Sequence, residues 1–263
     1  MTMTYQGTTA LITGASSGLG AEFAGQFAAR GSNLVLVARR ADRMEELARD
    51  LRSRHGVTVT VLPLDLGRAG AGRELFNELA GRGIAVDTLI NNAGFATHGP
   101  LVEEDPETIA SEISLNVAAL VDITRAFLPG LLASGKGSLV NVASTAAFQP
   151  IPGMAVYGAT KAFVLSFTEA VAHETKNSGL SVLALCPGAT STEFFEVLGG
   201  ESAAVGKMQT PAQVVGTALK ALDRKDTPGS VVSGWVNRVT AGFAQRMPRA
   251  VTVAIAARAV QDW

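Results

Sequence analysis

The sequence predicts an α/β fold, a doubly wound parallel sheet of about seven strands with helices on both faces. Short apolar runs alternate with helical patterns along the chain, which is typical of parallel strands joined by crossover helices. The runs are apolar at consecutive positions, as expected for strands buried on both faces. A glycine-rich turn follows the first run. A chain of 263 residues can bury one large core, so we expect a single domain over residues 1–263.

The expected strands and helices alternate in chain order. Asp105-Pro106 and Thr210-Pro211 are typical helix starts, because a capping side chain precedes a proline at the first helical position. Strands are expected at Ala10–Thr13, Asn33–Ala38, Val57–Leu62, Asp87–Asn91, Ser138–Val142 and Ser181–Cys186. Helices are expected at Leu19–Arg30, Asp42–His55, Gly70–Arg82, Glu107–Ser134 and Val156–Ser178.

The turn Thr13–Gly20 lies between the first strand and the first helix, which is the context of a dinucleotide-binding turn. Gly14 permits the tight turn, Gly18 lets the backbone approach a pyrophosphate, and Gly20 allows close helix–strand packing. The helix N-terminus supplies free N–H groups and the positive end of the helix dipole. We therefore expect nucleotide phosphates at this turn.

Tyr157 and Lys161 are four positions apart, so they lie on one face of a helix, one turn apart. A phenol has an unperturbed pKa of about 10. An ammonium group held next to it should lower that pKa, and the tyrosine could then exchange a proton with a substrate oxygen near neutral pH. On its own the pair also fits an amphipathic tyrosine beside a solvated lysine.

With these motifs in order, the chain resembles the short-chain dehydrogenase/reductase family, from about Thr8 to Thr192. The resemblance implies a Rossmann fold, with a cofactor-binding and catalytic core over residues 8–192 and a substrate-loop region with an apolar extension over residues 193–263. The motifs that carry it are Thr13–Gly20, Asp65, Asn91-Asn92-Ala93-Gly94, Asn116, Ser144, the Tyr157/Lys161 pair, Pro187-Gly188 and Thr192.

The resemblance implies hydride transfer between a nicotinamide cofactor and a carbonyl or secondary alcohol. Tyr157 would be the general acid/base, Lys161 would lower its pKa and hold the cofactor ribose, and Ser144 would donate a hydrogen bond to the substrate oxygen. Asn116 would hold a water that relays protons from Lys161. The implied cofactor-binding residues are Gly14, Ser16, Ser17, Gly18, Leu19, Gly20, Arg39, Arg40, Asp65, Leu66, Asn92, Ala93, Gly94, Tyr157, Lys161, Pro187, Gly188, Thr190 and Thr192.

The end of the second strand favours NADP(H) over NAD(H). Relatives that prefer NAD carry an acidic residue there for the ribose hydroxyls, whereas this chain has Ala38. Arg39 could clamp a 2′-phosphate with its guanidinium group, and Arg40 could stack near the adenine or assist. Two solvated arginines are the alternative. Ser17 stands where some NADP-dependent relatives carry a basic residue, so dual specificity stays open.

Apolar residues flank the expected catalytic groups and predict a pocket for a lipophilic ketone, aldehyde or alcohol, although they would also suit ordinary core packing. The apolar tail beyond Trp235 could form an amphipathic helix that covers this cleft or packs on another subunit, with membrane-surface contact as an alternative. The candidate pocket residues are Phe95, Phe148, Gln149, Ile151, Met154, Phe194 and Phe195.

Composition excludes several classes of function. The formal net charge is −1 and the arginines are dispersed, which gives no electrostatic case for nucleic acid. One cysteine, Cys186, allows no internal disulfide and fits a reducing cytoplasm. No signal peptide, no membrane-spanning run and no cluster of metal ligands is expected, and the family resemblance implies a homodimer or homotetramer.

Three interpretations stay open at this stage. The favoured one is an NADPH-dependent carbonyl reductase or alcohol dehydrogenase. A cofactor-binding regulator without turnover is the second, and a scaffold dominated by the apolar tail is the third. The set of Asn116, Ser144, Tyr157 and Lys161 favours the enzyme, because a regulator has no need of a proton donor and its partners.

Overall fold

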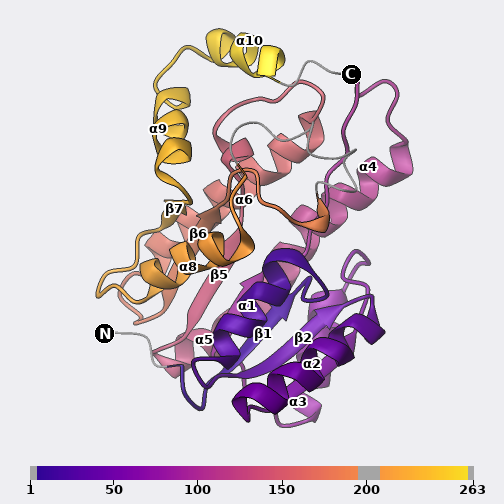
Figure 1. Ribbon diagram of the computed structural model, residues 1–263, viewed down its shortest axis with the longest axis vertical. Coiled ribbons are helices and arrows are strands. Elements are labelled where there is room, and N and C mark those ends of the chain that lie inside the picture. Colours follow the sequence, from indigo (N-terminus) through magenta and orange to yellow (C-terminus); the bar gives the residue numbers. More distant parts are fainter. Residues whose placement is uncertain (1–4, 195–207, 260–263) are drawn as a thin grey trace.

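The computed structural model describes residues 5–194 and 208–259, and within them the chain forms one seven-stranded sheet (Figure 1). Its strand order is β3-β2-β1-β4-β5-β6-β7, with every neighbouring pair parallel. The order reverses between β1 and β4, and in open sheets of this kind ligands bind at the carboxyl ends of the strands at that point. The strands are β1 (Thr9–Thr13), β2 (Asn33–Ala38), β3 (Val59–Pro63), β4 (Thr88–Asn91), β5 (Ser138–Val142), β6 (Ser181–Cys186) and β7 (Ser230–Val232).

Helices cover both faces of the sheet, and the alternation of side chains along β1 shows how. Ile12 packs in one core with residues of α1, α2 and α8, whereas the adjacent Leu11 packs in the other with α3, α5 and α6. Successive strand residues point to opposite faces, so an apolar strand supplies both cores. The helices are α1 (Gly18–Ala28), α2 (Ala41–His55), α3 (Ala71–Gly81), α4 (Pro106–Ile113), α5 (Leu120–Ser134), α6 (Ala155–Glu174), α8 (Pro211–Leu222), α9 (Trp235–Ala244) and α10 (Arg249–Ala259).

The predicted fold class is confirmed, and the strand and helix boundaries differ by a few residues at most. Both predicted helix starts are also confirmed. The Asp105 side chain accepts a hydrogen bond from the Thr108 N–H, and Thr210 forms a reciprocal capping box with Gln213. These features depend on local sequence, which is why the sequence predicts them well.

The helix predicted over residues 107–134 is not uniform. A π-helical turn, η1 (Ser114–Ala119), separates α4 from α5. A π turn accommodates an extra residue and is frequent at functional sites. Asn116 lies within it and is buried.

The stretch Pro106–Ser134 is long and apolar enough to cross a membrane by length and composition, with a mean hydropathy of 1.5 in its most apolar window. No membrane-spanning run was expected from the sequence, and this stretch was not singled out. Ile123, Phe127 and Leu131 of α5 pack in the core formed with α3 and the sheet. A core helix of this kind passes the same compositional test, because one of its faces is apolar for packing.

The C-terminal extension forms two helices, α9 and α10, where the sequence predicted one amphipathic helix. Pro248 lies between them, and the residue before a proline is disfavoured in helical conformation. The two helices lie beyond the carboxyl ends of β6 and β7 (Figure 1). They therefore stand over the edge of the sheet where a ligand site is expected.

Candidate active site

A cavity of about 900 Å³ opens at the carboxyl ends of the strands. The glycine turn and the loop after β2 line one end, and Tyr157, Phe194, α9 and α10 line the other. Among the predicted catalytic and cofactor residues, only Gly20 and Asn116 do not line it, and both are buried behind it. The structure thus gathers residues from the first to the last helix around one space.

The glycine turn has the backbone geometry that its sequence predicts. Gly14 and Gly18 have φ values of 65° and 54°, a region that side chains disfavour. A Cβ atom on Gly14 would lie 2.9 Å from the Cα atom of Ala93, and one on Gly20 would lie 2.2 Å from the Gly14 carbonyl oxygen. The absence of these side chains lets the turn, helix α1 and the end of β4 approach closely.

Thr13 and Asn92 join the glycine turn to the end of β4. The Thr13 hydroxyl accepts hydrogen bonds from the backbone N–H groups of Asn92 (2.9 Å) and Ala93 (3.0 Å). The Asn92 side chain donates to the carbonyl oxygens of Thr13 (3.0 Å) and Gly14 (3.3 Å). Asn92 was expected among the cofactor-binding residues. It lines the cavity and also fixes the turn, a role that the sequence did not indicate.

Arg40, in the loop after β2, lines the cavity. Its guanidinium group donates to the Ser16 and Ser17 hydroxyls, at 3.0 and 2.8 Å for its Nη2 atom, and its Nη1 atom lies 2.9 Å from a Glu193 oxygen. Arg43 pairs with the other Glu193 oxygen, and these two arginines lower the pKa of Glu193 to about 2. Arg39 lines the same space and makes no hydrogen bond or ion pair with a residue that the structure describes. A negatively charged group therefore already sits among these cations.

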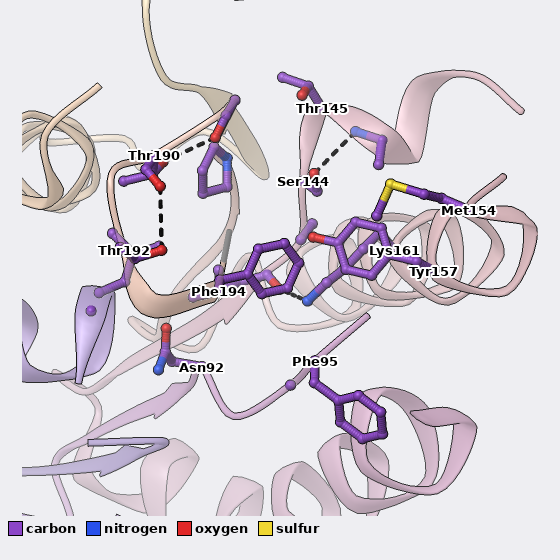
Figure 2. A pocket seen from close by; sticks show the side chains of 18 of the residues that line it. Asn92, Phe95, Ser144, Thr145, Met154, Tyr157, Lys161, Thr190, Thr192 and Phe194 are labelled. Carbon is purple, nitrogen blue, oxygen red and sulfur yellow. Dashed lines mark hydrogen bonds between the residues drawn. The ribbon is translucent and has the colours of Figure 1, made fainter. Parts of the chain in front are cut away.

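Tyr157 and Lys161 lie on α6 at the floor of the cavity, with exposures of 9% and 6% (Figure 2). The Lys161 Nζ atom donates to the Val142 carbonyl oxygen (2.9 Å) and lies 5.7 Å from the centre of the Tyr157 ring. Ser144 lies at the start of the short 3-10 helix η2 (Thr145–Phe148), and its hydroxyl accepts from the Ala146 N–H. All three side chains reach the same part of the cavity.

The proton affinities of the pair differ from the expectation. Burial raises the pKa of Tyr157 to about 12, although a hydrogen bond with Ser144 acts in the opposite direction. Burial also lowers the pKa of Lys161 to about 8. Desolvation disfavours the charged form of each group and is the largest cause of both pKa shifts. The phenol therefore stays protonated at neutral pH, which suits a proton donor better than a proton acceptor.

Asn116 binds the backbone of the turn after β4. Its side chain accepts a hydrogen bond from the Phe95 N–H (3.1 Å) and donates to the Phe95 carbonyl oxygen (2.8 Å) and to Thr160 (3.2 Å). A Cβ atom on Gly94 would lie 2.7 Å from the Asn116 amide oxygen and 3.6 Å from Lys161 Nζ. Asn116 thus stands directly behind Lys161, separated from it by a turn that has room only for glycine.

The other end of the cavity is apolar. Phe194 packs on Tyr157 with ring centres 5.5 Å apart, and Met154 and Ile151 belong to the same cluster (Figure 2). Phe95 lines the cavity, but its ring is directed away from Tyr157 (Figure 2). The predicted residue Phe195 lies outside the described residues. Two other predicted residues, Phe148 and Gln149, also line the cavity.

Helices α9 and α10 form a wall of this apolar end. Asn237 packs closely on Gly188: a Cβ atom added to Gly188 would lie 2.3 Å from the side-chain amide nitrogen of Asn237. Of the two expected uses of the tail, the structure shows cleft covering. The wall residues are Val236, Asn237, Thr240, Ala241, Phe243, Ala244, Met247, Thr252, Ile255 and Ala256.

Sequence reasoning missed three charged residues at the site. Arg43 and Glu193 lie 150 positions apart, and no local pattern links them. Glu112 precedes Asn116 by one helical turn, so the face that it shares with Asn116 could have identified it. Among the described residues, no group of three or more His, Cys, Asp or Glu side chains could hold a metal ion.

The comparison with known proteins agrees with this geometry. Sulfoacetaldehyde reductase 2 of Chromohalobacter salexigens is 41% identical over 197 residues, which are 74% of this chain and 77% of the relative. The NADP-dependent 3-hydroxy acid dehydrogenase of Schizosaccharomyces pombe is 35% identical over 190 residues, which are 72% of this chain and 73% of the relative.

Solved structures match over nearly the whole chain. A short-chain dehydrogenase from Sphingobium yanoikuyae in complex with NADPH has a TM-score of 0.80 at 36% identity, covering 92% of this chain and 97% of that one. The bulky-bulky ketone specific alcohol dehydrogenase from Comamonas testosteroni has a TM-score of 0.76 at 33% identity, covering 92% and 96%. A 7β-hydroxysteroid dehydrogenase structure has a TM-score of 0.86 at 27% identity, covering 97% and 99%.

A family model described as short chain dehydrogenase matches residues 8–201. The match spans the glycine turn, the end of β4, Ser144 and the Tyr157/Lys161 pair, which are the features that surround the cavity. The chain is therefore an oxidoreductase that belongs to the short-chain dehydrogenase/reductase family.

Proposed function

We propose that this protein is an NADPH-preferring carbonyl reductase that acts on lipophilic ketones or aldehydes, with Tyr157 as the proton donor. The observation that carries the proposal is the cavity itself. One space joins a glycine turn and a cluster of arginines to a buried, protonated phenol and an apolar wall. A dinucleotide and a hydrophobic carbonyl compound need these four surroundings together.

The residues present fit a bound NADP(H). The N-terminus of α1 has no side-chain cap at Ser17, so its first N–H groups are available to phosphate oxygens. Glu193 places a carboxylate between Arg40 and Arg43, which indicates that an anion fits there. We assign the 2′-phosphate to Arg39 and Arg40, which both line the cavity, and a solved NADPH complex within the family supports this choice of cofactor.

The cofactor supplies the hydride, and the protein supplies the proton and the geometry. Tyr157 donates its hydroxyl proton to the carbonyl oxygen, because its raised pKa keeps that proton on the phenol at neutral pH. Ser144 donates a hydrogen bond to the same oxygen and stabilises the charge that develops on it. Lys161 stabilises the phenolate left behind, and Asn116 fixes the backbone of the Gly94–Phe95 turn behind Lys161.

The lining of the cavity favours an apolar substrate. Phe194, Met154 and Ile151 pack around Tyr157, and α9 and α10 add mainly apolar side chains. Among the described residues at this end, Lys161 is the only lysine or arginine that lines the cavity. One relative is named for a sulfonated aldehyde, and the sulfonate group of such a substrate would bind best beside a further cationic side chain at this end. The names of two structural neighbours, a bulky ketone and a steroid enzyme, fit the apolar lining better.

Oligomeric state and compartment extend this proposal. We propose a cytoplasmic homodimer or homotetramer, as the family resemblance implies. Val239 and Phe243 of α9 are 48% and 65% exposed, which would suit contact with a second subunit. Light scattering of the purified protein measures the assembly directly.

The test begins with binding. NADPH and NADH are titrated against the wild type, Arg39→Ala, Arg40→Ala and a control, Arg49→Ala, whose side chain is exposed on α2 and does not line the cavity. We expect tighter NADPH binding in the wild type and the control, and a loss of roughly tenfold or more in the two cavity variants. Equal affinity for the two cofactors would refute the phosphate assignment.

Turnover is then measured from NADPH absorbance with an aryl alkyl ketone and with sulfoacetaldehyde. Tyr157→Phe removes only the hydroxyl group and should lower kcat by a factor of about 100 or more while NADPH still binds. The enzyme should prefer the ketone. Near-normal turnover in Tyr157→Phe would refute the proton donor, and a preference for the sulfonate would refute the substrate class. A folded wild type that binds NADPH but reduces no carbonyl compound would favour a cofactor-binding regulator or scaffold.

A further inference from the structure

Glu112 is a buried carboxylic acid beside the catalytic residues that the proposed mechanism does not use. Its side chain lies on α4 with 0% exposure. Acidic side chains are almost never fully buried unless they are paired or serve a function, because the loss of hydration is costly. No lysine or arginine among the described residues forms an ion pair with it within 4 Å.

Helix geometry places Glu112 in line with Asn116. The two residues are four positions apart across the junction of α4 and η1, and both contact the turn that follows β4. Asn116 binds the N–H and carbonyl groups of Phe95, and Glu112 Oε2 accepts a hydrogen bond from the Thr97 N–H at 3.0 Å. Two buried side chains thus hold alternate residues of this turn, whose Gly94 lies between Asn116 and Lys161.

The second carboxyl oxygen of Glu112 indicates that binding the turn is not the whole role of this residue. Oε1 is buried and has no hydrogen-bond partner among the residues that the structure describes. An amide side chain such as glutamine would hold Thr97 equally well and would carry no charge. Burial raises the pKa of Glu112, whereas its hydrogen bond with Thr97 and the charge of Lys161 act to lower it. As a carboxylate, Glu112 raises the pKa of both Tyr157 and Lys161.

We propose that Glu112 is a positioning residue of the catalytic pair: its buried carboxylate holds the turn after β4 and keeps Lys161 in its ammonium form. This inference rests on the proposed roles of Tyr157 and Lys161. A protonated Lys161 stabilises the phenolate that forms when Tyr157 gives up its proton, whereas a neutral amine would not.

The direction of the effect follows from the charges around the pair. Burial lowers the pKa of Lys161 to about 8, and Glu112 acts against that lowering. Glu112 likewise raises the pKa of Tyr157, so its carboxylate helps to keep the phenol protonated. Cys186 at the end of β6 also raises the pKa of Lys161, and Glu104, before α4, raises the pKa of Glu112 itself. Removing the Glu112 charge should therefore lower the pKa of Lys161 below about 8.

The test measures Lys161 without any substrate. Protein labelled with ¹³C-lysine is titrated between pH 6 and 10 by NMR, and the Lys161 Cε signal is assigned by its disappearance in Lys161→Arg. Glu112→Gln keeps an acceptor for Thr97 and removes the charge. Glu107→Gln removes the same charge from an exposed position on the same helix and is the matched control. We expect the Lys161 midpoint to fall by about one pH unit in Glu112→Gln and to stay unchanged in Glu107→Gln.

An unchanged Lys161 midpoint in a folded Glu112→Gln protein would overturn the proposal. If that variant does not fold, Glu112→Asp provides the second measurement, because it keeps the charge and shortens the side chain. Its Lys161 midpoint should stay within a few tenths of a unit of the wild type, and a fall as large as one unit would refute the electrostatic role.

Activity supplies a separate readout. If the wild type reduces a ketone, the alkaline limb of its pH profile should move to lower pH in Glu112→Gln, and this change should be absent in Glu107→Gln. If the wild type turns over no carbonyl compound, the proposed function fails while the NMR titration still decides the role of Glu112. The two failures are therefore distinguishable.

Discussion

Two alanine substitutions in the same helix should change stability in opposite directions. Gly20 lies in the first turn of α1, and a Cβ atom there would lie 2.2 Å from the Gly14 carbonyl oxygen and 2.8 Å from the Asn92 amide nitrogen. Gly25 lies in the same helix, and a Cβ atom there would meet nothing within 4 Å. Both substitutions add the same methyl group, so their difference isolates the close contact.

The magnitudes follow from these distances. In Gly20→Ala the N-terminus of α1 must move by about 1 Å from the end of β1, and overpacking of this kind costs roughly 1–3 kcal/mol. In Gly25→Ala no contact opposes the better helix propensity of alanine, which is worth about 0.5–1 kcal/mol. At about 2–4 °C per kcal/mol for a chain of this size, Gly20→Ala should melt several degrees below the wild type. Gly25→Ala should melt slightly above it.

Thermal unfolding followed by circular dichroism, with and without NADPH, tests both effects. The shift in α1 should also weaken NADPH binding about tenfold or more in Gly20→Ala, because the glycine turn moves with the helix. Gly25→Ala should bind NADPH as the wild type does. If Gly20→Ala melts as high as Gly25→Ala and keeps wild-type affinity, the close approach at this turn is not what requires glycine.

Two further predictions concern buried ionisable groups. Lys161→Met should raise the free energy of unfolding at pH 7 by roughly 3 kcal/mol, since the depressed pKa of about 8 means that the buried ammonium destabilises the fold at lower pH. The penalty disappears as the pH rises from about 8 to 10.4, because Lys161 then loses its proton in both states. Denaturant unfolding should therefore show wild-type stability rising over this pH range, and Lys161→Met should lack that rise. The control Lys176→Met, at an exposed position, should keep the rise. Cys186, the only cysteine in the sequence, is buried with its pKa raised to about 12, so a thiol reagent should label the protein only after unfolding. Fast labelling of the folded protein would contradict that burial.

Local sequence predicted most of the fold. The strands, the helix caps and the glycine turn depend on residues close together in the chain, and each carries a pattern or a spacing that a short segment displays. The sequence also predicted that Tyr157 and Lys161 share a helix face, because four residues make about one turn. These features required no knowledge of how the sheet is ordered.

Packing decided the proton affinities of the pair. The sequence placed an ammonium beside a phenol and so predicted a lowered tyrosine pKa. Tertiary structure instead buries both groups, and desolvation raises the pKa of Tyr157 to about 12. No sequence pattern gives the degree of burial, since it depends on Phe194, Met154 and other residues that arrive from distant parts of the chain.

By itself the sequence determined the fold class, the family and the residues of the glycine turn. Only the tertiary structure brought Glu193 to Arg40 across 153 positions and set α9 and α10 over the site. It also placed the charge of Glu112 near Lys161. The reason is physical. Local sequence patterns reflect interactions between residues close together in the chain, whereas charge interactions and desolvation depend on distances through space that only the folded chain fixes.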